Sequence, residues 1–144
     1  MGTSMIERLN KSRYNLLKWS TVGWAIWFGT FTLNDIIDNS ITRGTIALIG
    51  VIGSVIWAIN FIKIYKLSRE LRLDSKLNNA LNDELHQFNG YKSVRVGYIV
   101  AMGITALFLC FSEFFMIPAL IVTKIILYFG VLSVLISGLI YNRD

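Results

Sequence analysis

The chain has 144 residues, of which 54% are hydrophobic and 16% are charged, and its formal net charge at pH 7 is +5. This composition leaves too little polar surface for an ordinary water-soluble domain, and the length leaves no room for a separate soluble catalytic domain. With one cysteine, Cys110, the chain forms no internal disulfide and no metal cluster built on thiolates. We therefore expect one all-α domain, residues 1–144, that lies in a membrane.

Four long stretches carry almost no charge. A helix rises about 1.5 Å per residue, so a hydrocarbon core about 30 Å thick needs roughly 20 mostly apolar residues. The clearest stretch, residues 44–62, holds no Asp, Glu, Lys or Arg. The sequence therefore predicts four membrane-spanning helices, at about residues 16–37, 44–64, 94–115 and 118–141.

Small residues recur at helical spacing in each predicted span. Inside lipid, helices associate through close backbone approach rather than through the hydrophobic effect, and small residues permit that approach. The pattern predicts a four-helix antiparallel bundle with short outer turns, and a homodimer through the same surfaces stays open as a second use. The residues are Thr21, Ala25, Gly29, Gly50, Ser54, Ala58, Gly97, Ala101, Thr105, Gly130, Ser133, Ser137 and Gly138.

Basic residues are concentrated on one side of the predicted membrane. Lysine and arginine collect in cytoplasmic loops. All of them except Arg43 and Lys124 fall in the N-terminal segment, in the loop between the second and third spans, or at the C-terminus. This predicts a multi-pass protein of the cytoplasmic (inner) cell membrane, with both termini in the cytoplasm. Because the lipid bilayer accounts for the positive loops, we expect no direct nucleic-acid partner.

The loop between the second and third spans, about residues 65–93, continues an apolar helical stripe beyond the predicted membrane. It predicts a cytoplasmic helical hairpin that extends helices 2 and 3, with Asn89-Gly90 as its weak point or break. One face of this hairpin is a candidate surface for a cytoplasmic protein, with an aromatic anchor and a charged rim. For Lys92 the simpler reading is a side chain at lipid headgroups. The candidate partner-binding residues are Asp83, Glu84, Phe88 and Lys92.

The hairpin also carries a short sequence pattern. The run Leu81-Asn82-Asp83-Glu84-Leu85 is followed by Asn89, Lys92, Arg95, Gly97 and Tyr98. This pattern resembles that of small bacterial inner-membrane proteins with four transmembrane helices. Some similar proteins are encoded beside small helix-turn-helix regulators, so the resemblance implies a regulatory pairing; it implies no particular activity.

Three polar residues lie in or near the predicted spans and are candidates for an intramembrane role, because ionisable groups in a membrane are functional candidates by default. Asn60 lies near the inner end of the second span, Glu113 lies at the end of the third, and Lys124 lies about one and a half turns into the fourth. Lys124 has two readings, a pair with Glu113 or a stem that extends outward to the membrane surface.

No catalytic or cofactor-binding motif is recognisable. The single histidine lacks neighbouring ligands or a nucleophile, and no phosphate-binding glycine loop is present. We therefore expect no enzyme and no cofactor. The favoured function is a regulatory or interaction protein that docks a cytoplasmic partner through the hairpin. The alternative is a small oligomeric transporter or channel subunit, although small multidrug exporters need a carboxylate deep within the membrane and the predicted spans hold Asp and Glu only at their outer ends.

Overall fold

The structure, a computed structural model, describes residues 2–73, 84–112, 114 and 116–142. Four α-helices make up this part of the chain: α1 (Gly2–Leu33), α2 (Ser40–Leu73), α4 (Glu84–Phe111) and α5 (Ala119–Tyr141). The all-α prediction is confirmed. α1, α2 and α4 are longer than the predicted spans, because α1 begins well before residue 16, α2 continues well beyond residue 64 and α4 begins well before residue 94, whereas α5 nearly matches its span.

Three helices contain segments that are long and apolar enough to cross a membrane: Ser40–Arg69, Gln87–Phe111 and Ala119–Tyr141. They belong to α2, α4 and α5. α1 is the least apolar of the four described helices, because its first half carries charged residues, asparagines and serines among the apolar ones. Length and composition thus bear out three of the four predicted spans.

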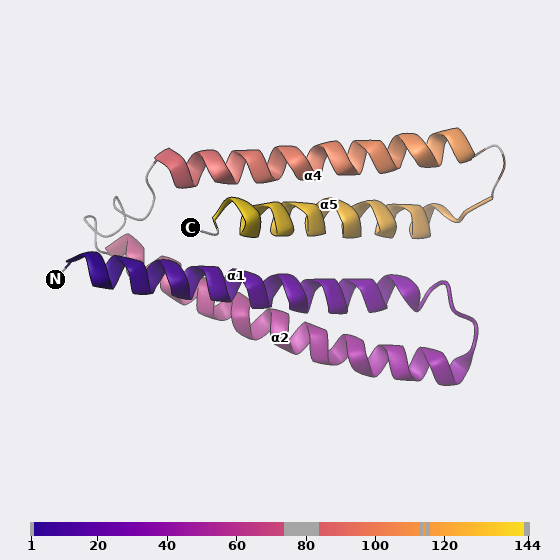
Figure 1. Ribbon diagram of the computed structural model, residues 1–144. Coiled ribbons are helices and arrows are strands. Elements are labelled where there is room, and N and C mark those ends of the chain that lie inside the picture. The colour runs from indigo at the N-terminus through magenta and orange to yellow at the C-terminus, as the bar shows by residue number, and fades with distance from the viewer. Residues whose placement is uncertain (1, 74–83, 113, 115, 143–144) are drawn as a thin grey trace.

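Figure 1 shows the four helices side by side, with consecutive helices running in opposite directions. α1 packs along α2, α4 packs along α5, and α1 also contacts α5. The order across the molecule is therefore α2, α1, α5, α4. Two helical hairpins, α1–α2 and α4–α5, meet along one seam between α1 and α5. The connections within both hairpins lie at the same end of the molecule (Figure 1).

Glycines allow α1 and α2 to approach closely. A Cβ atom on Gly23 would lie 2.6 Å from the backbone nitrogen of Trp57, and a Cβ atom on Gly53 would lie 2.6 Å from the backbone nitrogen of Trp27. Both distances are shorter than any stable contact, so neither position has room for a larger residue. The contact is therefore made backbone to backbone, which is the close approach that small residues permit between helices.

The pair α4 and α5 is built in the same way. A Cβ atom on Gly97 would lie 2.1 Å from Val134 Cγ2 and 2.9 Å from the carbonyl oxygen of Gly130. A Cβ atom on Gly130 would lie 3.3 Å from the Cβ of Ala101. Three small residues singled out in the sequence, Gly97, Ala101 and Gly130, thus lie at the contact between these helices.

Local side-chain chemistry sets where α2 and α5 begin. Asn39 caps α2: its Oδ1 accepts hydrogen bonds from the backbone nitrogens of Ile41 at 3.0 Å and Thr42 at 3.4 Å. Pro118 stands immediately before α5, where its missing N–H costs no hydrogen bond. Its carbonyl oxygen accepts from the backbone nitrogen of Ile121 at 2.9 Å.

Candidate functional site

The start of α4 is fixed to the end of α5 by Asn89. This side chain is buried, and its Nδ2 donates a hydrogen bond to the carbonyl oxygen of Tyr141 at 2.9 Å. Ser93 Oγ, also buried, donates to the carbonyl oxygen of Asn89 at 2.8 Å. The predicted break at Asn89-Gly90 is wrong, because α4 runs through both residues without interruption. Asn89 satisfies an orphan carbonyl at a helix end instead of ending its own helix.

Two of the predicted partner-binding residues lie together at this end. Lys92 Nζ lies 4.4 Å from the centroid of the Phe88 ring and 5.7 Å from that of Tyr141. These are cation–π distances. Phe88 is nevertheless 54% exposed. We call Phe88, Lys92 and Tyr141 the Phe88 face. Glu84 is the first residue of α4, but its side chain and Asp83 lie outside the described part of the structure.

α1 contributes a half-buried arginine near its N-terminus. Burial lowers the pKa of the Arg13 guanidinium, because desolvation disfavours the charged form. The ordinary pKa of arginine is so high that this side chain stays protonated at neutral pH. The start of α1 thus keeps a positive charge in a partly dehydrated place.

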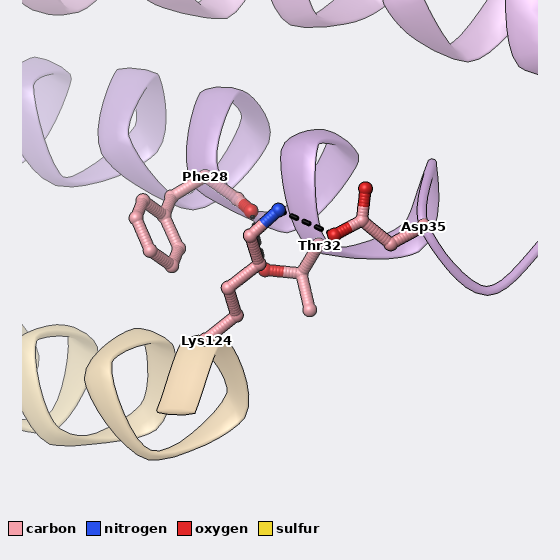
Figure 2. Close-up of polar contacts among 4 residues, drawn as sticks. All are labelled: Phe28, Thr32, Asp35 and Lys124. Carbon is pink, nitrogen blue, oxygen red and sulfur yellow. Dashed lines mark hydrogen bonds and ion pairs between the residues drawn. The ribbon is translucent and has the colours of Figure 1, made fainter. Parts of the chain in front are cut away.

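At the opposite end of the molecule, Lys124 of α5 reaches across to α1 (Figure 2). Its Nζ forms an ion pair with Asp35 Oδ2 and lies 3.7 Å from the centroid of the Phe31 ring. The side chain of Lys124 is 13% exposed and that of Asp35 is 27% exposed. Lys124 therefore pairs across the seam instead of extending outward to solvent, and its predicted alternative partner, Glu113, lies outside the described residues.

The end of α1 places Asp35 for this contact. Thr32 Oγ1 donates to the carbonyl oxygen of Phe28 at 2.9 Å, and the backbone nitrogen of Asp35 donates to the carbonyl oxygen of Thr32 at 3.3 Å (Figure 2). Asp35 consequently lies in the turn directly after α1. A carboxylate there faces the negative end of the helix dipole, so the ammonium of Lys124 compensates both.

The remaining polar candidate, Asn60, is not part of this group. Its Nδ2 donates to the carbonyl oxygen of Ile56 at 2.7 Å, one turn earlier in the same helix. Lys124 thus pairs with Asp35, whereas the amide of Asn60 forms a hydrogen bond within α2.

Trp24, Trp27 and Trp57 form one aromatic cluster. The ring centroids of Trp24 and Trp27 are 5.5 Å apart, and that of Trp57 lies 5.2 Å from Trp27. The cluster continues through Phe28 to Tyr128 of α5, whose ring is nearly parallel to that of Phe28 at 6.3 Å. Aromatic side chains thus fill the space among α1, α2 and α5, in keeping with the packing role that large apolar rings usually have.

Sequence reasoning missed Asp35 and Phe31 as partners of Lys124. The charge pattern did hold a signal, because Asp35 and Lys124 both fall on the outer side of the predicted membrane. Asp38 and Glu113 share that side, however, so charge alone did not single out the partner. Asn89 and Tyr141 were missed for a similar reason: a side chain to carbonyl bond 52 residues apart leaves no spacing pattern.

Comparison with protein-family models, with curated proteins and with solved structures finds no match to this chain. Among the described residues, no three His, Cys, Asp or Glu side chains gather as a metal site would require.

Proposed function

We propose that this chain is a multi-pass integral membrane protein that docks a cytoplasmic protein through the Phe88 face. The proposal places all four helices in the cytoplasmic membrane as an antiparallel bundle, with both termini and the α2–α4 connection in the cytoplasm. Three helices with spanning length and composition support the membrane placement. The basic residues near that connection support the orientation. The regulatory pairing implied by the sequence pattern belongs to the same proposal.

The observation that carries the docking proposal is the half-exposed ring of Phe88 beneath a lysine ammonium. An exposed aromatic anchor with a cation at its rim is typical of the residues that dominate protein–protein contacts. The hydrogen bond from Asn89 to Tyr141 holds this turn of α4 rigidly against α5. A rigid anchor loses little conformational freedom on binding, and that favours affinity. The non-enzymatic reading rests on the sequence, which has one histidine and one cysteine.

Site-specific photo-crosslinking tests this function. A photoreactive residue at Phe88 is expected to capture a soluble cytoplasmic protein in intact cells, and a reagent at Tyr98 is the matched control. Tyr98 is also exposed, at 66%, but lies nearly three turns further along α4, toward the predicted lipid. Capture should fall when Lys92→Gln is added. Equal capture from both positions, or capture of lipid alone at Phe88, would contradict the proposal.

A second candidate function is a small oligomeric transporter or channel subunit. The ion pair between Asp35 and Lys124 favours it, because charged groups among apolar helices commonly mark transport pathways. Flux of organic cations into vesicles that contain the reconstituted protein tests this candidate. Transport that is lost in both Asp35→Asn and Lys124→Met, but kept in Phe88→Ala, would favour the transporter over the docking protein.

A further inference from the structure

Contacts of one kind hold the two helices of each hairpin together. Contacts of another kind join the two hairpins to each other. Within each hairpin, glycines such as Gly23 and Gly97 leave no room for even one added carbon. Along the seam between α1 and α5 the fit is looser. A Cβ atom on Gly138 would lie 3.9 Å from Leu17 Cδ2, and one on Gly29 would lie 3.2 Å from the hydroxyl of Tyr128. Of the three extensive helix contacts, α1–α2, α4–α5 and α1–α5, the α1–α5 seam is therefore the easiest to separate.

An ion pair crosses this seam. Asp35 follows α1, Lys124 belongs to α5, and the two residues are 89 positions apart in the chain. The ring of Phe31 lies under the ammonium and adds a second attraction from the α1 side. The side chain of Lys124 is largely shielded from solvent, so removal of Asp35 leaves the ammonium poorly solvated and without this partner, whereas Asp35 is the more open of the two.

The position of this ion pair allows it to control the separation of the two hairpins at one end of the seam. It lies at the end of the molecule where each hairpin turns, and so at the far end of the seam from the chain termini (Figures 1 and 2). Toward the termini, Leu17 of α1 and Gly138 of α5 face each other across the same seam. Ion pairs in low-dielectric surroundings contribute more to a specific arrangement than to net stability.

We propose that Asp35 and Lys124 form a latch that holds the two hairpins together at the end where they turn. When the latch breaks, the seam opens from that end, while each hairpin keeps its own glycine contacts. The latch is a built-in conformational device, and it does not depend on the docking function of the Phe88 face.

Distance measurements between spin labels test the latch. One label is placed on the native Cys110, which is exposed at the end of α4, and the other on Ile41→Cys, which is at the start of α2 and 81% exposed in the native chain. These positions report the separation of the hairpins at the latch end. A second protein carries Cys110→Ala with labels at Tyr65→Cys and Tyr91→Cys, both exposed positions toward the opposite end of the same two helices.

The labelled protein in lipid nanodiscs is compared with three variants of the ion pair and with one control variant. Asp35→Asn and Lys124→Met each remove one charge with little change in shape. The exchange Asp35→Lys with Lys124→Asp restores an ion pair of reversed sense. Asp38→Asn is the matched control, because it removes an exposed carboxylate from the same turn.

The latch predicts that both single variants lengthen and broaden the 41–110 distance distribution and leave the 65–91 distribution unchanged. The exchange should recover a narrow 41–110 distribution, and Asp38→Asn should match the unmodified protein. Unchanged 41–110 distances in both single variants would overturn the proposal. So would broadening at both ends, which would indicate a general loosening of the fold, and so would an exchange variant that stays open.

Discussion

At the scale of single residues, the glycines of the helix contacts divide into two kinds. Gly97 is enclosed by Val134 and the backbone of Gly130, whereas Gly103, on the same helix, has no neighbouring atom within 4 Å of an added Cβ. The two positions share helical backbone and identical chemistry. They differ only in whether another helix lies beside them, so they form a natural pair of test sites.

We expect Gly97→Ala to destabilise the protein by about 1–3 kcal/mol, the usual cost of forcing an extra carbon into a packed contact. Gly103→Ala should be neutral or add up to about 1 kcal/mol, because alanine favours the helix more than glycine does. Unfolding of the purified protein in mixed micelles, followed as denaturing detergent is raised, gives both values. Equal effects of the two substitutions would contradict the α4–α5 contact described above.

Asn89 and Asn60, whose amide groups both donate to backbone carbonyl oxygens, make a second pair. Asn89→Ala removes a hydrogen bond between α4 and α5, so we expect a loss of about 1 kcal/mol in unfolding free energy. Asn60→Ala removes a bond within one helix, and the carbonyl of Ile56 keeps its place in the helix, so little change is expected. The same micelle titration measures both. A larger loss for Asn60 than for Asn89 would show that the amide of Asn60 has a partner in the membrane that this structure lacks.

Sequence reasoning reached some of these residues and not others, for physical reasons. Four-residue spacing identified Gly97 and Gly130, because a repeated small residue marks a helix face. Gly23 and Gly53 lie against the backbone of the facing helix in the α1–α2 contact, yet they were not singled out. Which of two glycine faces meets a neighbour depends on how the helices are rotated, and that rotation follows from packing partners far away in the chain.

At the scale of helices, composition predicted the apolar core of each element better than its ends. The predicted first span starts near residue 16, but α1 extends back to Gly2. Apolar composition marks where a helix is suited to lipid, whereas hydrogen bonding decides where a helix ends. Asn39 at the start of α2 shows the second effect, since its side chain caps the helix.

α1 is the helix whose place depends most on its neighbours. It lies between α2 and α5, and its polar side chains Ser20, Thr21 and Thr32 are buried. The hydroxyls of Thr21 and Thr32 donate hydrogen bonds to carbonyl oxygens one turn earlier in the same helix. The burial of these two threonines therefore leaves neither hydroxyl donor unpaired. A helix of this composition is suited to the interior of a bundle more than to a surface that faces lipid.

We therefore expect α1 alone to insert into membranes less efficiently than α2, α4 or α5, and to insert better when α2 follows it. Glycosylation mapping of single helices and of the α1–α2 hairpin, each placed in the same carrier protein, measures the inserted fraction. Substitution of Thr21 and Thr32 by valine should raise the insertion of α1 alone. Equal insertion of all four single helices would show that α1 needs no neighbour.

At the scale of the whole molecule, the arrangement places charges in two separate groups. The described end that holds the chain termini and the start of α4 carries basic residues on three helices, among them Arg13 of α1, Lys66 of α2 and Lys92 of α4. The end where the hairpins turn carries Asp35 and Asp38, with Lys124 drawn into the latch. An asymmetry of this kind is what orients membrane proteins, because basic loops stay in the cytoplasm.

Cysteine accessibility in intact cells tests that orientation. In a protein with Cys110→Ala, a membrane-impermeant thiol reagent is expected to modify Ser40→Cys and to leave Ser68→Cys unmodified until the cells are opened. Both serines are exposed, and they stand near opposite ends of the same helix, so a difference in labelling reports the side of the membrane and not burial. The reverse pattern would place the Phe88 face outside the cell and exclude a cytoplasmic partner. Labelling of both cysteines in intact cells would show that α2 does not cross the membrane.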